Sequence, residues 1–323
     1  MQNKKKIVVL ASNYGGKPDK NIIAIAYHLA SHEEVQLVIS TNHQGKQYWP
    51  RTITEQHSVV SRTSLSALMY MLMAHAILYT HSLSDAFPYA HRIPGFSLVC
   101  QAIKVFLQHG VIGLKKNLAN GKTLSQYLLR LQPTFDYMVV SSSHEANLVA
   151  GLGINSDKIK VTGLPRFDLY KSIPRVSSDN RKVLIFLTWQ AQKTGLGKLS
   201  YLIECLESHD EKIEYDVINH PMISKGSPAE ISISDYSLLI TDDSSLAWDF
   251  FYTYRDVIFF RPGEWLTHNE KLDSLIAHDS FGLNKLLAKH FINSEPTFKP
   301  SDVADWVDAN NCERVAKLIH ISR

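Results

Sequence analysis

The chain has 323 residues, of which 45% are hydrophobic and 20% charged, and its formal net charge is +3. This length predicts two domains, each with its own hydrophobic core, and no apolar run approaches the ~18 residues of a membrane-spanning helix. The three cysteines are too scattered for a disulfide framework or a zinc site. Because the short apolar start also lacks the features of a signal peptide, a cytoplasmic location is expected.

Strand-like and helix-like segments alternate along the first half of the chain. Residues 7–11 form a continuous apolar run, which is typical of a strand covered on both faces. Apolar residues then recur at helical spacing over 22–29, with Asp19 as the expected N-cap. The same reasoning predicts strands at 35–40, 77–80, 103–107, 137–141 and 160–162, and helices at 65–73, 123–132 and 143–152.

The second half repeats this alternation after a Pro- and Ser-containing linker at 172–181. Strands are predicted at 183–187, 214–218, 236–241 and 257–260, helices at 197–208 and 246–252, and a helical tail at 301–320. The pattern indicates an α/β protein with two Rossmann-like, doubly wound domains at 1–171 and 181–300, followed by the tail at 301–323. Ligands of such sheets bind beyond the carboxyl ends of the strands.

The clearest strand-end signal is Asp242-Asp243-Ser244-Ser245, which follows one predicted strand and opens a helix. The free N–H groups and positive dipole at a helix start favour phosphate, and the two serines add hydroxyl donors. Asp243 or Ser244 as a simple N-cap accounts for the same pattern.

Two histidines also follow predicted strands. His109 precedes Gly110, where a ligand could approach the backbone closely, and His220 precedes Pro221. A histidine of near-neutral pKa can take a proton from an attacking hydroxyl. A buried, hydrogen-bonded histidine is the structural alternative for both residues.

Other strand-end residues have similar pairs of interpretations. Arg166 can grip a phosphate with two N–H groups or pair with Asp168 across a turn. Thr188 and Trp189 follow another strand, and the indole is suited to the wall of a binding site. The loop at 13–17 contains two glycines but lacks the spacing of a dinucleotide or P-loop motif.

In this order and spacing, five short motifs resemble the CDP-glycerol glycerophosphotransferase family of teichoic-acid and capsule enzymes. They are Gln-His-Gly-Val-Ile-Gly-Leu-Lys at 108–115, Gly-Leu-Pro-Arg-Phe-Asp at 163–168, Thr-Trp-Gln at 188–190, His-Pro at 220–221, and Thr-Asp-Asp-Ser-Ser at 241–245 followed by Asp249 and Arg-Asp-Val-Ile-Phe at 255–259. The departures from the family pattern are Gln108 in place of Trp, Val111-Ile112 in place of Thr-Pro, and Gln190 in place of Arg.

The resemblance implies a GT-B fold, two Rossmann-like domains facing a central cleft, and transfer of a polyol-phosphate from a CDP-activated donor with release of CMP. It implies that the donor's pyrophosphate lies against Ser244 and Ser245, with His220 and Arg166 stabilising charge, and that His109 is the general base. It implies neither a metal nor another cofactor. Its acceptors are lipid-linked or polymeric glycans, so the apolar stripe at 65–73 either touches the cytoplasmic leaflet or packs in the core.

Two alternatives to this reading stay open. The first is a GT-B sugar transferase or UDP-sugar 2-epimerase, which would share the fold and a diphosphate site. The second is a family member that binds nucleotide without catalysis, which the departures at Gln108 and Gln190 favour. A nucleic-acid partner is not expected, because no basic run is interleaved with aromatic residues.

Overall fold

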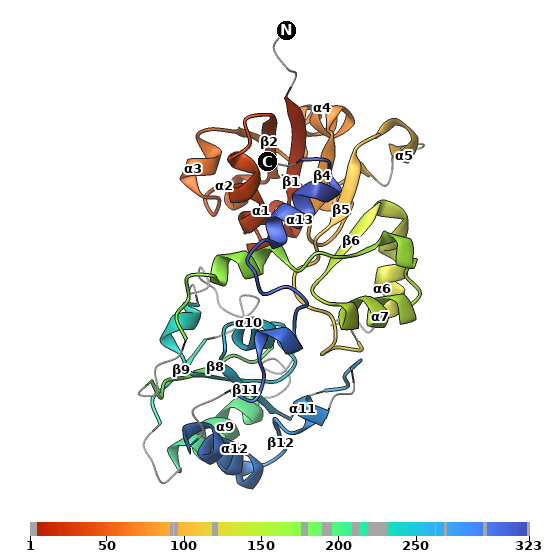
Figure 1. The fold of residues 1–323 in the computed structure, drawn as a ribbon. Coiled ribbons are helices and arrows are strands. Elements are labelled where there is room, and N and C mark those ends of the chain that lie inside the picture. The colour runs from red at the N-terminus through yellow and green to blue at the C-terminus, as the bar shows by residue number, and fades with distance from the viewer. Residues whose placement is uncertain are drawn as a thin grey trace. The chain divides into compact units, whose positions relative to one another are not determined.

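A computed structural model describes residues 5–90, 93, 96–117, 122–175, 180–188, 196–208, 213–218, 231–261, 263–267, 270–292 and 296–321. The chain divides into two compact units (Figure 1). Unit 1 contains Met1–Val111, Ser125–Lys171 and Asp305–Arg323, and unit 2 contains Ile112–Leu124 and Ser172–Ala304. The division after Lys171 falls at the predicted linker. The segment Ile112–Leu124 and the returning C-terminal segment are two exchanges between units that the sequence did not indicate.

Unit 1 is built on a seven-stranded parallel sheet in the order β3-β2-β1-β4-β5-β6-β7. Its strands are β1 (Lys6–Ala11), β2 (Val35–Thr41), β3 (Ser58–Ser61), β4 (Ala76–Tyr79), β5 (Ile103–Phe106), β6 (Tyr137–Val140) and β7 (Ile159–Val161). Its helices are α1 (Lys20–Ala30), α2 (His43–Lys46), α3 (Arg51–Thr54), α4 (Leu65–Met73), α5 (Phe96–Val99), α6 (Leu124–Leu131), α7 (Ser143–Gly151) and α13 (Asn311–Leu318). All strands are parallel, and the order in which they are added to the sheet reverses between β1 and β4, as in a Rossmann fold.

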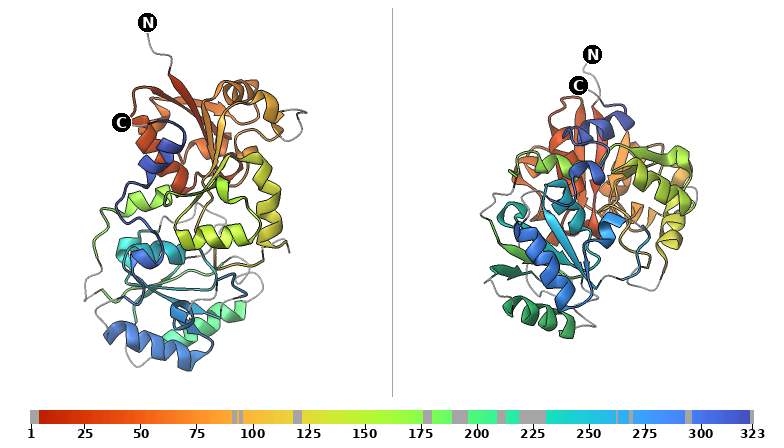
Figure 2. Two further views of the ribbon diagram at one scale, coloured as in Figure 1. Left: turned by 45° about the vertical axis from the view of Figure 1, so that its right-hand side comes forward. Right: turned by 60° about the horizontal axis from the view of Figure 1, so that its bottom comes forward.

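The elements of unit 1 form where the apolar pattern predicts them. The central strands β1 and β4 are almost fully buried, because helices cover both faces of the sheet (Figure 2). Helix α1 begins where expected, since the carboxylate of Asp19 accepts a hydrogen bond from the backbone N–H of Asn21 at 2.7 Å. Ile22, Ile25 and Leu29 of this helix have no exposed surface.

Unit 2 is built on a five-stranded parallel sheet in the order β12-β11-β10-β8-β9. Its strands are β8 (Val183–Ile185), β9 (Tyr215–Val217), β10 (Leu238–Thr241), β11 (Asp256–Phe260) and β12 (Ile276–Ala277), and its helices are α9 (Leu196–Glu207), α10 (Leu246–Tyr252), α11 (Glu270–Asp273) and α12 (Ser280–Ile292). Strand residues of β8, β10 and β11 pack with α9 and α12 in one core.

The predicted helical tail is wrong over most of its length. A short 3-10 turn occupies Pro300–Asp302, and helix begins again only at Asn311. Between them, Asp305 accepts hydrogen bonds from the backbone N–H and hydroxyl of Ser143, and Ala309 has a left-handed φ of 55°. These features hold the segment in an irregular conformation, and Trp306 and Val307 are exposed rather than core residues.

The apolar stripe at 65–73 forms helix α4 as predicted, but most of it is not core. Ala67 and Met71 are buried, whereas Leu65, Met69 and Met73 are 73%, 47% and 55% exposed. These three lie four residues apart and therefore share one face of the helix. In the part of the chain that the structure describes, no helix combines the length and hydropathy needed to cross a bilayer.

Candidate functional site

His109 lies just beyond the carboxyl end of β5, on a loop that buried side chains hold in place. The preceding residue, Gln108, has a left-handed φ of 50°, and its side-chain amide donates to the carbonyl of Val139 at 2.9 Å and to the carboxylate of Glu145 at 3.0 Å. The carbonyl of Gln108 accepts from the amide of Asn21 at 3.0 Å. The His109 side chain itself is exposed, so it is not the buried, structural histidine of the alternative interpretation.

The imidazole of His109 stacks on that of His81, which follows the adjacent strand β4. The ring centroids are 4.7 Å apart and the rings are nearly parallel, at 4°. Burial lowers the pKa of His81, although the carboxylate of Asp85, 3.8 Å from its Nδ1, acts in the opposite direction. His81 therefore favours the neutral form.

A buried carboxylate joins the loops after β1 and β4. Asp85 has no exposed surface and accepts from the backbone N–H groups of Tyr14 and His81, each at 2.9 Å. The hydroxyls of Ser12 and Thr80, at the same two strand ends, lie 2.7 Å apart. These bonds fix the backbone under the histidine stack.

Residues of the motif at 163–168 also hold the loop that carries His109. Arg166 is buried, its guanidinium donates to the carbonyl of His109 at 2.9 Å, and its backbone N–H donates to the side chain of Asn21 at 3.0 Å. Asp168 accepts from the backbone N–H groups of Asn311 and Cys312 and so receives the first turn of α13. Gly163 is required here, because a Cβ atom would lie 1.8 Å from the side-chain oxygen of Asn311.

The glycine loop at 13–17 serves packing. Gly15 has a φ of 81°, and its carbonyl accepts from the hydroxyl of Thr41 at 2.7 Å and from the backbone N–H of Asn42 at 2.9 Å. A Cβ atom on Gly45 would lie 1.9 Å from that carbonyl. The glycines thus allow the loops after β1 and β2 to pack closely against each other. This packing explains the two glycines of a loop whose sequence lacks a nucleotide-binding motif.

A cavity of about 650 Å³ opens beside the histidine stack in unit 1. Tyr14 lines it and lies against His81, with 5.8 Å between the ring centroids. Lys104 and Arg130 bring positive charge to its wall. The remaining lining is mostly apolar and includes Leu83, Ala90, Ile93, Phe96, Leu131 and Pro133.

In unit 2, the strand ends of β8 and β10 meet as the parallel pairing requires. The backbone N–H and the hydroxyl of Thr188 donate to the two carboxylate oxygens of Asp242, at 2.9 and 2.6 Å. Both residues are buried. Asp242 is therefore fully engaged in joining two strand ends.

The neighbouring carboxylate, Asp243, points to a different loop. It accepts from the backbone N–H of Gly263 and from the indole N–H of Trp265, each at 2.9 Å. Burial raises its pKa, while these two hydrogen bonds and the charge of Lys115 act to lower it. Asp243 thus binds the loop at 263–267 to the end of β10 through hydrogen bonds, and it interacts electrostatically with Lys115.

The predicted serines follow immediately. Ser244 is buried and its hydroxyl accepts from the backbone N–H of Leu246 at 3.2 Å, so it caps α10 as the structural interpretation allows. Ser245 is the residue before the helix and makes no side-chain cap bond. The two hydroxyls lie beside Asp242 and Asp243 along the chain, at the carboxyl edge of the sheet.

Sequence reasoning missed Lys198, in the first turn of α9. Its ammonium donates to the carbonyl of Arg261 at 2.7 Å, burial lowers its pKa, and the carboxylates of Asp242 and Asp243 act to raise it. A lysine at a helix N-terminus opposes the helix dipole. A lysine in this unfavourable position is the sequence signal that could have identified Lys198, because a bound anion would offset the repulsion between its charge and the helix dipole.

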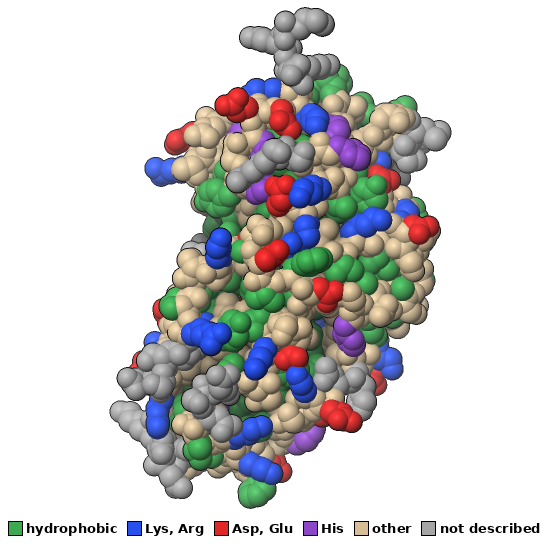
Figure 3. Space-filling model, in the orientation of Figure 1, with side chains coloured by type: hydrophobic (Ala, Val, Ile, Leu, Met, Phe, Trp, Pro, Cys, Tyr) green, Lys and Arg blue, Asp and Glu red, His purple; other side chains and the backbone are tan. Residues whose placement is uncertain are grey.

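Several predicted residues fall outside the described chain. Trp189, Gln190, His220 and Pro221 are among them. Among the described residues, the structure brings His109, Gly110 and Arg166 together in unit 1, and Thr188, Asp242, Ser244 and Ser245 together in unit 2. Each group lies at the carboxyl edge of its own sheet. Basic and acidic side chains are interspersed on the surface that Figure 3 shows, without an extended basic patch.

Chemically, the two edges offer different functions. Unit 1 presents an exposed imidazole on a rigid backbone, which suits proton transfer. Unit 2 presents hydroxyls and an ammonium group at strand ends, which suit a phosphate. Among the described residues, one group of three metal-ligating side chains occurs, His28, His32 and Glu313, and it belongs to neither edge.

Comparison with known proteins agrees with both the motifs and the fold. The family model described as CDP-glycerol:poly(glycerophosphate) glycerophosphotransferase matches residues 1–227. No curated protein sequence matches the chain.

Solved structures similar to this chain include the wall teichoic acid polymerase TagF, with a TM-score of 0.68 and 16% identity over 98% of this chain and 89% of that one. A TagF variant soaked with CDPG matches with a TM-score of 0.66 and 17% identity over the same shares of the two chains. UDP-GlcNAc 2-epimerase from Neisseria meningitidis bound to UDP-GlcNAc matches with a TM-score of 0.61 and 10% identity over 97% of this chain and 99% of that one. At these identities the likeness establishes the fold, two Rossmann-like units of the GT-B type.

Proposed function

Because this chain belongs to the CDP-glycerol:poly(glycerophosphate) glycerophosphotransferase family and is a transferase of that type, we propose that it moves glycerol-phosphate or ribitol-phosphate from a CDP-activated donor. The acceptor is a hydroxyl of a cell-surface glycan or of a lipid-linked precursor. The acceptor oxygen forms a new bond to the phosphorus that carries the polyol, the bond from that phosphorus to the bridging oxygen breaks, and CMP leaves with the bonding electron pair.

His109 is the general base of this proposal. The observation that carries it is an exposed imidazole at the end of β5, stacked on His81 and held by Arg166 through its backbone carbonyl. The acceptor's proton passes to the imidazole as the hydroxyl attacks. The His81 ring beneath it favours the neutral form and so adds no positive charge beside the base. Arg166 acts as a positioning residue, and Gly110 leaves room for the substrate beside the loop.

The donor's diphosphate is assigned to the strand ends of unit 2. Lys198 supplies positive charge and Ser244 and Ser245 supply hydroxyl donors, while the Thr188–Asp242 pair keeps β8 and β10 in register. Transfer of a phosphoryl group depends mainly on positioning and on stabilising negative charge. His220 as a second charge-stabilising residue and Trp189 as a donor contact stay predictions from the family motifs, since both lie outside the described residues.

The cavity beside Tyr14 is the proposed acceptor site. Its apolar lining and its two cations, Lys104 and Arg130, suit a molecule that joins phosphate to an apolar or saccharide portion. Its position next to the His81–His109 stack supports this assignment, because the acceptor hydroxyl has to reach the base.

A peripheral contact with a membrane surface fits a lipid-linked acceptor. The exposed apolar face of α4, formed by Leu65, Met69 and Met73, is the surface we assign to it. Flotation with anionic liposomes tests this: replacing all three residues by Ser should abolish co-migration, while Phe281→Ser, which removes an equally exposed apolar side chain from unit 2, should leave it intact. Equal flotation of both variants would remove the assignment.

The function is tested by a thermal-shift screen followed by product analysis. CDP-glycerol or CDP-ribitol should raise the melting temperature, since a ligand that binds the folded state stabilises it, and CMP should appear when a glycan acceptor is added. A shift with UDP-GlcNAc and none with CDP-polyols would instead favour the epimerase or sugar-transferase alternative. Binding of CDP-polyols without CMP release from any teichoic-acid or capsule acceptor would identify a non-catalytic member.

A further inference from the structure

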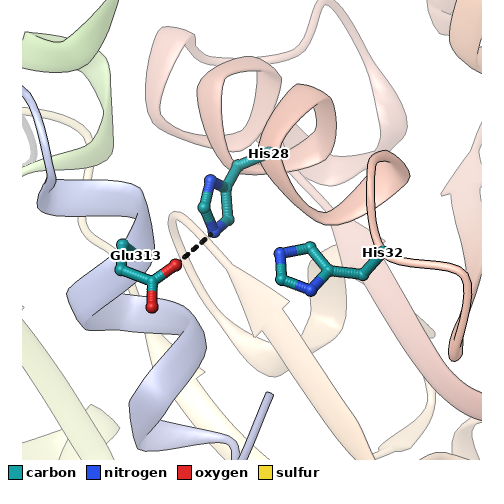
Figure 4. A group of neighbouring side chains, drawn as sticks. All are labelled: His28, His32 and Glu313. Carbon is teal, nitrogen blue, oxygen red and sulfur yellow. Dashed lines mark ion pairs between the residues drawn. The ribbon is translucent and has the colours of Figure 1, made fainter. Parts of the chain in front are cut away.

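Three metal-ligating side chains meet between two helices of unit 1 that lie far apart in sequence (Figure 4). His28 comes from the last turn of α1, His32 follows that helix, and Glu313 comes from the first turn of α13. Each offers one ligand atom, and these atoms all lie within 4.8 Å of one another. The Nε2 of His28 is 3.4 Å from a carboxylate oxygen of Glu313.

The chain conformation at the end of α1 explains why the rings of the two histidines come together. His32 lies just past the end of α1, where its backbone N–H donates to the carbonyl of Leu29 at 3.1 Å and keeps the chain beside the last turn. The rings of His28 and His32 lie 5.1 Å apart and are tilted by 55°. That arrangement turns the rings toward a common point instead of stacking them face to face.

His32 adds an independent sign of a missing ligand. The residue is only 7% exposed, and its Nε2 is buried with no hydrogen-bond partner among the described residues. Buried polar groups are normally satisfied, because an unmade hydrogen bond leaves the cost of desolvation uncompensated. A metal ion coordinated at this point would satisfy the ring.

We propose that His28, His32 and Glu313 bind one divalent transition-metal ion of the zinc class, with water completing the coordination. Two imidazole nitrogens and one carboxylate oxygen suit Zn²⁺, whereas Mg²⁺ and Ca²⁺ prefer oxygen ligands throughout. In a tetrahedral site with bonds of about 2.0–2.1 Å, ligand atoms are about 3.3–3.4 Å apart. The separation between His28 and Glu313 is already 3.4 Å.

The rest of the cluster leaves one carboxylate oxygen available for such an ion. The ammonium of Lys317 lies 3.4 Å from the Oε1 of Glu313, whereas the oxygen that faces His28 is Oε2. The carboxylate can therefore bridge a lysine and a metal.

The position of the site indicates a structural function. Helix α1 starts near the carboxyl edge of the sheet with Asp19 and runs back, so its last turn lies toward the opposite edge from His109. The ion would join α1 to α13, which are in contact, and thereby hold the returning segment Asp305–Arg323 on unit 1. This inference does not depend on the proposed transfer reaction.

Zn²⁺ titration of the full-length protein, freed of metal by a chelator and desalted, tests the site. One equivalent of Zn²⁺ should bind, and the melting temperature should rise by about 5 °C or more at a hundredfold excess over the dissociation constant, with no comparable effect of Mg²⁺. Co²⁺ should give the visible absorption of a low-symmetry nitrogen–oxygen site, which reports coordination without any activity assay.

Two ligand variants and one control decide the outcome. His32→Gln and Glu313→Gln should each weaken Zn²⁺ binding at least about 10-fold, because loss even of an outer partner of a metal ligand commonly costs that much. His43→Ala, which removes an exposed histidine of unit 1, should bind as the parent does. Glu313→Gln decides alone if His32→Gln fails to fold. Equal affinity in parent and Glu313→Gln, or no stoichiometric binding by the parent, would overturn the proposal.

Discussion

At the carboxyl edge of the unit 1 sheet, buried amide and guanidinium side chains donate to the backbone carbonyls of neighbouring loops, whereas at the edge of unit 2 two adjacent carboxylates accept hydrogen bonds from backbone and side-chain donors. In unit 1, Asn21, Gln108 and Arg166 each bond to a backbone carbonyl of another segment. In unit 2, Asp242 accepts from the hydroxyl of Thr188 and Asp243 from the indole of Trp265. The two edges are thus organised for different tasks.

The difference teaches what each edge can contribute to a transfer reaction. The hydrogen bonds to the backbone in unit 1 fix one loop geometry and leave the imidazole of His109 facing solvent. Unit 2 instead places the carboxylates of Asp242 and Asp243 close to the ammonium group of Lys198. Both carboxylates already accept hydrogen bonds from neighbouring groups. A base needs a fixed position, and an anion site needs matched charge.

The largest effect should come from the base. We expect His109→Ala to lower turnover by about 10²–10⁴-fold, the usual contribution of a positioned general base, because proton transfer from the acceptor is lost. Steady-state kinetics of CMP release measures it, and donor affinity by titration calorimetry should be unchanged.

His43→Ala provides the matched control for this substitution, since it removes an exposed histidine of the same unit, on α2, that belongs neither to the histidine stack nor to the lining of the cavity. Near-parental turnover of His109→Ala would show that unit 1 supplies something other than the base. The assignment of the base to unit 1 and of the anion site to unit 2 would then be wrong in its first part.

A smaller effect should come from the ammonium group of unit 2. Lys198→Met keeps the length of the side chain and removes its charge, so it should weaken binding of CDP-glycerol by about 10- to 100-fold, as expected for a charge-assisted hydrogen bond. Titration calorimetry at two salt concentrations measures the loss. Lys289→Met, on the exposed face of α12, should bind as the parent does, and equal binding by both variants would exclude Lys198 from the donor site.

The two hydroxyls should matter less. Replacing Ser244 and Ser245 together by Ala should weaken donor binding by about 2- to 13-fold for each hydroxyl that binds the donor, because neutral hydrogen bonds contribute about 0.5–1.5 kcal/mol each. Since Ser244 also caps α10, a melting curve must accompany the calorimetry. A lower melting temperature with unaltered donor affinity would leave Ser244 with its capping function alone.

The sequence predicted most of the buried framework, because apolar periodicity reports burial directly. The parallel strands and the cap at Asp19 follow from it. Strand β3 and helix α12 were missed: β3 is a half-buried Ser-Val-Val-Ser segment without a clear apolar run, and α12 buries only Leu283 and Leu287. The apolar spacing at Trp306 and Val307 misled in the other direction, since both side chains are exposed.

The partners within the site could not be predicted from the sequence. His81 becomes the neighbour of His109 only because β4 pairs with β5, and Lys198 approaches Asp242 only because β8 pairs with β10. Strand order decides both pairings, and periodicity within a strand carries no information about it. Similarly, Asp168 meets α13 rather than serving only a local turn, because the C-terminal segment returns to unit 1.

The smallest predicted effect concerns the stack itself. Burial lowers the pKa of His81 below the value of about 6.5 for an unfolded chain, so the folded state binds fewer protons and loses stability as the pH falls through that value. His81→Phe keeps an aromatic ring under His109 and removes this titratable group, so it should reduce the loss of stability between pH 7.5 and 5.5. Urea unfolding at both pH values measures the difference, with His43→Phe as the exposed control. A parental pH dependence in His81→Phe would mean that Asp85, facing the ring at 3.8 Å, offsets the effect of burial on the pKa of His81, so that burial does not hold the ring beneath His109 in its neutral form.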